Sequence, residues 1–409
     1  TSSPSLPCLS PPITDVVLQK TESGVKKKRV KRTKKEYENP VRARKIKFHP
    51  TSEQATLLKK WLGSVRFTYN KLVASFKRVH LGGVSRKVFR EKVREEKERN
   101  PWMSEIPGEV IDTAVAEFDK ARAAHFAKEK IDTNAIFKFR SKKDPQQSLE
   151  IRARDMGRKS GMFKDINFNN LKLSESVPFP TNSIRIVRDR LKRWYVVVPC
   201  ETPPKSENQA PKEVESVVAL DPGVRAFQTT YDVSGISTEW GNGDMGHLIR
   251  LCDHADKLQS AWKAKKGRPR ARTKRAWLRM FERIRCLVKE LHRKMSSWLV
   301  NNYRVVLLPT FESQSMVDKT KRVIGKRTAR SMLTWSHYTF KMMLKSKEEL
   351  YPWFRMIECN EAFTSKTCGH CGTLVDVGSS KEFSCRACGY VADRDINGAR
   401  NILLRYLSR

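Results

Sequence analysis

Apolar residues in the first half of the chain recur with the period of a strand, then of helices, then of strands again. Residues 44–51, RKIKFHPT, alternate as a strand does, and a helix is expected to begin at Thr51 or Ser52. The apolar positions of that helix share one face: Leu57, Leu58, Trp61 and Leu62. Helical periodicity continues over residues 85–130, and residues 136–200 return to strand character. This order predicts a sheet interrupted by a helical insertion.

A polar, proline-containing segment at 201–215, ETPPKSENQAPKEVE, is the expected boundary between two domains. It follows a predicted β-hairpin that turns around Arg190 and Lys192. Beyond it the pattern predicts, in chain order, a buried strand before Asp221, a helical stretch over 245–302, a buried strand over 303–311, a helix over 328–350, a strand at 357–363 and a closing helix from Asp395. The chain is therefore expected to be an α+β protein.

The net charge is the strongest compositional signal. Lysine and arginine number 82 and aspartate and glutamate 44, which gives a formal net charge of +38 over 409 residues. A compact chain with this charge repels itself unless a polyanion screens it, so nucleic acid is the expected partner. Hydrophobic residues make up 39%, too many for a wholly disordered polycation. The sequence shows neither a membrane-spanning apolar run nor a signal peptide, which argues against membrane and secreted proteins.

Residues 1–40 are expected to form a disordered tail. The opening is rich in Ser and Pro, and eight of the ten residues from Lys26 to Lys35 are basic. Such a run serves as a nuclear localisation signal or as a nucleic-acid-binding arm. We expect it to direct the protein to the nucleus.

Four of the nine cysteines form two pairs with the same internal spacing: Cys368 with Cys371, and Cys385 with Cys388. The pairs are separated by thirteen residues, which is the spacing of a zinc ribbon. Gly372 and Gly389 follow the pairs directly and allow the positive φ that a turn around a metal needs. Four thiolates fill a tetrahedral site, so we expect one structural Zn²⁺ ion with no vacant position for catalysis.

Two aspartates stand where a sheet and a helix can bring carboxylates together. Asp221 ends an apolar strand before Pro-Gly, and Asp395 begins the closing helix. Either one alone is an ordinary turn former or helix cap, and Asp393 is expected to cap that helix. However, a first strand ending in Asp, a later strand carrying Glu and a following helix starting with Asp is how a two-metal nuclease assembles its carboxylates. This pattern predicts two Mg²⁺ ions.

Three motifs follow one another in a specific order: LDPGVRAFQTTYD, the cysteine module and ADRDINGARNILL. In this order they resemble the split RuvC-like nuclease of the TnpB proteins and of type V CRISPR effectors, and the eukaryotic Fanzor branch is the closer match. EAFTSKTCGHCG, the segment 292–308 and the opening 45–70 resemble further parts of that family. The resemblance implies an RNA-guided DNA endonuclease. Its partners would be a transposon-derived guide RNA, the ωRNA, and double-stranded target DNA beside a short flanking motif.

The resemblance also assigns metal ligands by position. Asp221 matches the first RuvC aspartate of the family, and Asp395 matches the third. The second ligand, a glutamate after an apolar strand, is replaced here by Pro309 in VVLLPTFES. The Fanzor branch is known for this loss and for a replacement glutamate several tens of residues later, which Glu361 matches. Two other glutamates remain alternatives: Glu312, three residues beyond Pro309, and Glu358.

The expected architecture has two lobes. Residues 41–205 would form a β-barrel-like wedge with a helical recognition insertion, and 206–215 a linker. Residues 216–409 would form an RNase H-like (RuvC) nuclease lobe with a zinc ribbon at 365–391, and the protein would be a monomer in its complex with guide RNA. Because Pro309 removes a ligand, a nuclease-dead binder of guide RNA and DNA is the alternative. A zinc-ribbon transcription or RNA-processing factor would leave the Asp-bearing strand and closing helix unexplained.

Basic residues are spread over both expected lobes, as a channel for a guide–target duplex requires. The main clusters are Arg44–Lys47, Lys263–Arg275 and Lys319–Arg330. Three tryptophans near such clusters either stack on unpaired bases or belong to the core: Trp262, Trp277 and Trp335. Arg190 and Lys192, which flank the predicted hairpin turn, suit phosphate contacts.

Overall fold

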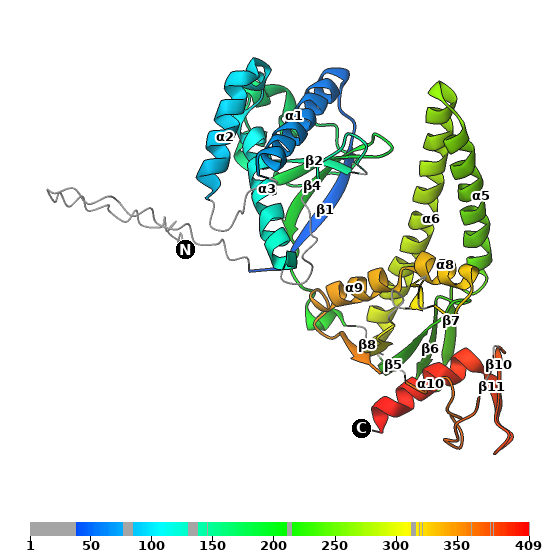
Figure 1. Ribbon diagram of the computed structural model, residues 1–409. Coiled ribbons are helices and arrows are strands. Elements are labelled where there is room, and N and C mark those ends of the chain that lie inside the picture. Colours follow the sequence, from blue (N-terminus) through cyan, green and yellow to red (C-terminus); the bar gives the residue numbers. More distant parts are fainter. Residues whose placement is uncertain are drawn as a thin grey trace, which may run out of the picture. The chain divides into compact units, whose positions relative to one another are not determined.

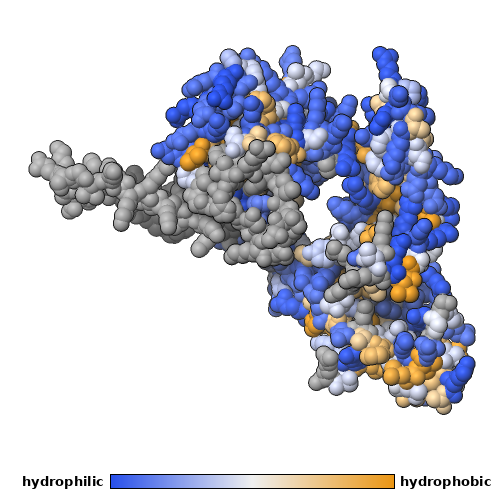
Figure 2. All heavy atoms as spheres, viewed as in Figure 1, coloured by the Kyte–Doolittle hydropathy of each residue, from blue (hydrophilic) through white to orange (hydrophobic). Residues whose placement is uncertain are grey.

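The computed structural model describes residues 38–76, 85–129, 138–144, 146–210, 215–311, 316–318, 320, 322–360, 362–376, 378 and 380–408. The basic run Lys26–Lys35, Glu312 and Glu361 lie outside the described residues. Within the described residues, no helix is long and apolar enough to cross a membrane. The surface seen in Figure 2 is predominantly hydrophilic.

The first half of the chain forms an antiparallel sheet with the strand order β1-β4-β3-β2. Its strands are β1 (Val41–Phe48), β2 (Gln146–Ile151), β3 (Ile184–Asp189) and β4 (Trp194–Glu201). Three helices pack with it: α1 (Ser52–Phe76), α2 (Arg86–Arg99) and α3 (Gly108–Glu129). One short α-helix and four 3₁₀ helices complete the connections: α4 (Ala153–Met156), η1 (Pro101–Glu105), η2 (Gly161–Ile166), η3 (Phe168–Asn170) and η4 (Glu207–Gln209).

A single apolar core joins this sheet to α1 and α3. Trp61 and Leu58 of α1 are fully buried, which confirms the apolar face predicted for that helix. The predicted wedge is not barrel-like in the described residues, where β1 and β2 remain the two edges of an open four-stranded sheet. Only an isolated bridge from Phe48 to Leu173 extends the β1 edge. Four strands are too few to close on themselves, so α1 and α3 cover the sheet instead.

The second half of the chain forms a mixed sheet with the strand order β7-β6-β5-β8-β9. Its strands are β5 (Glu215–Pro222), β6 (Gln228–Asp232), β7 (Ser237–Trp240), β8 (Tyr303–Pro309) and β9 (Arg355–Cys359). Strands β5, β8 and β9 are mutually parallel, whereas β6 runs antiparallel to β5 and β7 antiparallel to β6, as in a meander. Parallel neighbours need helical crossovers, and these account for the helices between the strands. They are α5 (Asp244–Ala264), α6 (Gly267–Asn302), α8 (Lys326–Trp335) and α9 (His337–Glu348).

Alternate residues of these strands face two different sets of helices. Val218 and Leu220 of β5 pack with α5, α6 and α9, whereas Ala219 packs with the last helix, α10 (Arg394–Leu407). The helix α10 lies against β5 and β6, and it follows the small hairpin of β10 (Glu382–Ser384) and β11 (Val391–Asp393) (Figure 1). The odd-numbered side of β5 therefore faces α10, and Asp221 belongs to that side.

The long basic helical stretch expected over 245–302 is two helices rather than one. The chain leaves helical geometry at Lys265 and Lys266, and α6 begins at Gly267. Pro269 lies in the first turn of α6, where its missing N–H costs no hydrogen bond, whereas it would break the interior of a continuous helix. The two helices form a long hairpin (Figure 1).

Candidate metal centres

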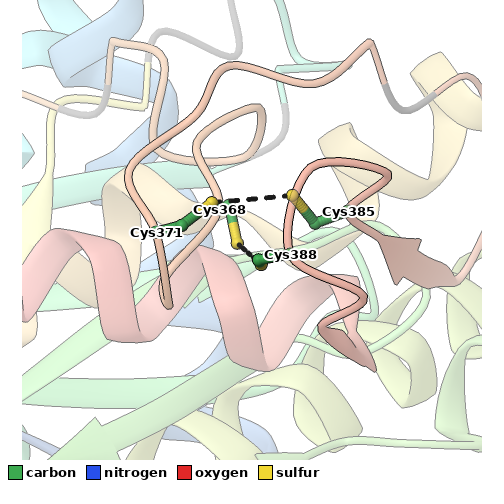
Figure 3. Close-up of side chains that lie close together, drawn as sticks. All are labelled: Cys368, Cys371, Cys385 and Cys388. Atoms are coloured by element: carbon green, nitrogen blue, oxygen red, sulfur yellow. Dashed lines mark hydrogen bonds between the residues drawn. The ribbon is translucent and has the colours of Figure 1, made fainter.

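The four paired cysteines gather their sulfur atoms in one place. All four Sγ atoms lie within 4.8 Å of one another, and two contacts, Cys368 to Cys388 and Cys371 to Cys385, measure 3.7 Å (Figure 3). A tetrahedral Zn²⁺ ion with Zn–S bonds of about 2.3 Å places its sulfur ligands about 3.8 Å apart. The two separations of 3.7 Å match this value, and all four sulfur atoms are close enough for one zinc ion to draw them together.

Each cysteine pair lies on its own tight turn, and the two turns have the same geometry. Gly372 and Gly389 have φ values of 77° and 74°, as the sequence predicted. The Gly372 N–H donates to the Cys368 carbonyl, and the Gly389 N–H donates to the Cys385 carbonyl, both at 2.9 Å. His370 stacks on Tyr390 with ring centroids 5.8 Å apart and does not belong to the sulfur group. The four cysteines are thus sufficient to complete the coordination sphere.

Two buried asparagines of α10 hold the first cysteine turn against that helix. The Asn397 side chain accepts from the Gly369 N–H and donates to the Thr367 carbonyl, each at 2.9 Å. Asn401 donates to the Thr364 and Thr367 carbonyls at 2.8 and 2.7 Å. The signal for this clamp in the sequence is two asparagines four residues apart, which lie on one face of the helix. The zinc module is therefore fixed to the helix that carries Asp395.

Asp221 reaches the same helix from the sheet. A Cβ atom built on Gly398 would lie 2.6 Å from Oδ2 of Asp221, so the carboxylate rests directly on the backbone of α10. Asp395 lies three residues before Gly398, one helical turn away on the same side. Two elements distant in sequence thus bring these predicted ligands to one strand–helix junction. Asp393 caps α10 by accepting from the Asp395 N–H at 2.8 Å, as predicted.

The surroundings of Asp395 are acidic. Burial, and next the neighbouring Asp393 carboxylate, raise the pKa of the Asp395 carboxyl, and Glu239 acts in the same direction. Lys381 lies between the last two groups, with ion pairs of 3.2 Å to Asp393 and 3.3 Å to Glu239. Half-buried carboxylates that repel one another are the oxygen donors that Mg²⁺ binds. With the Asp221 carboxylate in the space that Gly398 leaves, this donor set fits a divalent cation held by Asp221 and Asp395.

Pro309, which stands where the family has its second metal-binding carboxylate, lies beside Asp221 in the strand register. In the register of the parallel strands, Ala219 pairs with Leu307 and Pro309 pairs with Cys359. Asp221, Pro309 and Cys359 therefore end neighbouring strands at one edge of the sheet. Neither proline nor cysteine supplies a carboxylate here, and the glutamates that follow these two strands, Glu312 and Glu361, lie outside the described residues.

Glu358 is engaged on the opposite side of the sheet. Its carboxylate pairs with Lys341 of α9 and, at 2.7 Å, with Lys345 of α9. The hydrogen bond from Lys341, followed by that from Lys345, lowers the pKa of Glu358. Alternation along β9 directs residue 358 away from α10, so this weakest of the three alternatives does not face Asp221.

The turn after Asp221 is braced by a buried aromatic cluster. Phe227 lies between the rings of His292 and His337, with centroid distances of 4.7 and 5.2 Å. Trp335 is fully buried and donates from Nε1 to the Val224 carbonyl at 3.1 Å. Of the two roles predicted for it, base stacking or a place in the core, the structure confirms the core. Burial lowers the pKa of His292 to about 4 and that of His337 to about 3, which keeps both rings neutral. No local pattern predicts this cluster, because its members come from three segments that are far apart in the sequence.

Two family models match the chain. Residues 337–402 match the model described as Cas12f1-like, TNB domain, and thus run from α9 to α10 with the zinc module between them. Residues 41–80 match a model described as a helix-turn-helix domain. The described residues of that second range form β1 and the single helix α1 rather than two helices.

Similar proteins extend over nearly the whole chain. A protein of Paramecium bursaria Chlorella virus 1 that is named as a transposase is 30% identical over 399 residues, which cover 90% of this chain and 87% of the viral protein. A TnpB-like protein of Acanthamoeba polyphaga mimivirus is 25% identical over 387 residues, which cover 89% of this chain and 73% of that protein. A protein of Streptomyces pristinaespiralis that is named as an RNA-guided DNA endonuclease is 26% identical over 385 residues and 88% of each chain.

The four-thiolate geometry predicts that the purified protein holds one zinc ion per chain and that Cys385→Ser releases it. The variant should also unfold at a lower temperature, because a tetrahedral site that lacks one thiolate loses much of its contribution to folding. Metal content by mass spectrometry and a thermal melt measure the two effects. Cys286→Ser, which removes an exposed thiol on α6, is the matched control and should keep its zinc. Wild-type protein without zinc would contradict the assignment.

Proposed function

Because this chain belongs to the TnpB-like transposase family, we propose that it is an RNA-guided endonuclease that cleaves DNA by metal-dependent hydrolysis. The observation that carries the proposal is the placement of Asp221 against Gly398, one turn from Asp395. Carboxylates brought together from a strand end and a helix start serve phosphodiester hydrolysis with two metal ions. The similarity to a protein named as an RNA-guided DNA endonuclease supports the same reaction.

The finer assignment is an RNase H-like nuclease of the RuvC type. It is supported by the meander of β6 and β7 beside β5, by the parallel strands β8 and β9, and by the position of α10 across β5. We further assign the chain to the Fanzor branch, on the replacement of the strand-end glutamate by Pro309. Residues 41–205, 206–215 and 216–409 are assigned as the recognition lobe, the linker and the nuclease lobe with its zinc ribbon.

Asp221 and Asp395 would hold the Mg²⁺ ions together with one glutamate. The bound ions supply an activated water and neutralise charge on the leaving oxygen. The chain itself contributes preorganisation, because Gly398 sets how closely α10 approaches Asp221 and the Asp393 cap fixes the first turn that carries Asp395. Lys381 keeps the carboxylates of Glu239 and Asp393 paired beside the site.

The strand faces favour Glu361 over Glu312 as the third ligand. Leu307, Ile357 and Cys359 pack on the α10 side of the sheet, which is also the side of Asp221. Strand β9 ends on that side at Cys359, two residues before Glu361 in the sequence.

The chain that follows β8 turns away from the α10 side of the sheet. The Phe311 N–H donates to the Pro309 carbonyl at 2.9 Å in a tight turn, and the Phe311 ring contacts His337, 4.8 Å away, on the opposite side of the sheet. Glu312 therefore follows a residue that is anchored away from α10. This contrast supports Glu361.

The net charge of the chain and the family to which it belongs both support nucleic-acid partners. A formal charge of +38 suits a chain that holds a guide RNA and a DNA duplex through their backbones. We propose that the guide is an ωRNA from a transposon end, that the first lobe reads a short motif beside the target, and that the protein is a monomer in this complex.

We also propose that the basic run Lys26–Lys35 directs the protein to the nucleus. Deletion of residues 1–40 should abolish the nuclear accumulation of a fluorescent fusion and leave RNA binding largely intact, because the family-like region begins after that segment. Nuclear entry of the truncated fusion would place the signal elsewhere.

The third-ligand assignment predicts that Glu361→Gln abolishes DNA cleavage and preserves RNA and target binding, since it removes a charge and keeps the side-chain volume. Asp221→Ala and Asp395→Ala should behave alike, whereas Glu312→Gln should retain substantial activity. Cleavage of a guide-matched duplex in Mg²⁺, with binding measured in parallel, tests the set. An essential Glu312 with a dispensable Glu361 would reverse the assignment. Absence of cleavage by the wild type with its own guide would favour the nuclease-dead binder.

The close approach of α10 predicts that Gly398→Ala lowers cleavage about 100-fold, because the new Cβ displaces the Asp221 carboxylate by about 1 Å. Alanine is favoured over glycine inside a helix by about 0.5–1 kcal/mol, so a lower melting temperature would report the clash with Asp221 and not a weaker helix. Gly246→Ala in α5 makes the same chemical change where only the end of Arg250 is near, at 3.8 Å, and is the control. A thermal melt and a cleavage assay separate the two effects. Full activity of Gly398→Ala would show that Asp221 is not held against α10.

A further inference from the structure

A cavity of about 670 Å³ has aromatic side chains on one side and basic side chains on the others. Trp262 of α5 and Trp277 of α6 contribute the aromatic part. The cations come from α1, from the segment before β2, from the β3–β4 hairpin and from α6: Lys59, Lys142, Lys143, Arg190, Lys192 and Lys274. The volume is within the range of sites for small molecules and single nucleotides.

The two acidic residues of this cavity are already engaged within their own turns. The Asp144 carboxylate accepts from the Ser141 N–H at 2.8 Å, and the Asp189 carboxylate pairs with Arg193 at 2.7 Å. With Arg188 included, seven basic residues line the cavity against these two acids. The cavity is therefore positively charged and favours an anionic ligand.

Three buried N–H donors of the lining have no hydrogen-bond acceptor among the described residues: Trp262 Nε1, Trp277 Nε1 and Arg188 Nε. Buried polar groups in folded proteins almost always have a partner. These three are shielded from solvent, so a ligand in the cavity reaches them only when the side chains around them move. All three groups are donors, so a ligand that satisfies them must supply acceptors. Phosphate oxygens and the ring nitrogens and carbonyls of nucleobases are such acceptors.

The tryptophans are arranged for stacking. Their ring centroids lie 5.6 Å apart with the planes inclined at 50°. The Arg270 guanidinium and the Lys274 ammonium lie over the Trp262 ring, 5.3 and 5.0 Å from its centroid. Unlike the fully buried Trp335, both tryptophans are only partly buried. Accessible aromatic rings among cations are how proteins stack unpaired bases while they contact the adjoining phosphates.

We propose that this cavity binds an unpaired nucleotide of an RNA strand, with its base against Trp262 and Trp277 and its phosphates on the surrounding cations. RNA is favoured over duplex DNA because recognition of RNA targets loops, bulges and ends whose bases are splayed out, whereas bases in a duplex are stacked within it. The identification of that RNA with the guide rests on the proposed function. The binding site itself rests on the cavity alone.

The test uses the full-length protein and a fluorescent single-stranded oligoadenylate RNA, compared with the same strand made abasic. Wild type should bind the base-bearing strand more tightly. Trp277→Ala should weaken that binding by about 5- to 150-fold and leave the abasic strand unaffected. Trp102→Ala, which removes a 37% exposed tryptophan outside the cavity, is the matched control and should change neither. Trp277→Phe keeps a stacking ring and should recover much of the loss, even if the alanine variant folds poorly.

Lys192→Ala should weaken binding of both strands alike and reduce the slope of log affinity against log salt by about 0.7, the value for one phosphate contact on a single strand. Equal effects of Trp277→Ala and Trp102→Ala, or tighter binding of a single DNA strand or an RNA duplex than of the single RNA strand, would overturn the proposal. None of these measurements needs cleavage. A binding-competent protein that fails to cut DNA would therefore contradict the proposed function and leave the nucleotide site standing.

Discussion

The close approach between α10 and the end of β5 is the constraint on which the rest of the second half depends. A helix can lie on the Asp221 carboxylate only where it has no side chain, and Gly398 provides that position. Glycine is unfavourable inside a helix by about 0.5–1 kcal/mol, so its presence there marks a geometric requirement rather than a preference of the helix. The apolar side chains Ile402 and Leu403 then hold α10 on the sheet through Ala219 and Leu307.

The same helix connects the two candidate metal centres. One side of α10 faces Asp221, while Asn397 and Asn401 bind the backbone of the first cysteine turn. A zinc ion that fixes the four cysteines would therefore fix the backbone that packs on α10, and through it the position of Asp395. In the proposed nuclease, the cysteine module would therefore support catalysis without any contact with substrate.

Local patterns predicted local structure well. The cysteine spacing and its two glycines, the Asp393 cap, the start of α1 and the β3–β4 hairpin all depend on residues close together in sequence, and the structure confirms each. The open first sheet, the contact between Gly398 and Asp221 and the cluster around Phe227 depend on tertiary packing of distant segments. No pattern within one segment encodes them. The break between α5 and α6 at Lys265 is local, and Pro269 in the sequence indicates it, but the predicted helical stretch over 245–302 did not include it.

We propose that the protein uses the carboxylates beside α10 to cleave DNA whose sequence is specified by a bound RNA. The most direct measurement is to isolate the protein with its bound RNA, sequence that RNA, and offer the complex a DNA duplex that matches it in Mg²⁺. The account predicts cleavage of the matching duplex, none of a scrambled duplex and none when EDTA removes Mg²⁺. Binding of the matching duplex without cleavage, across duplexes with varied flanking sequences, would contradict it.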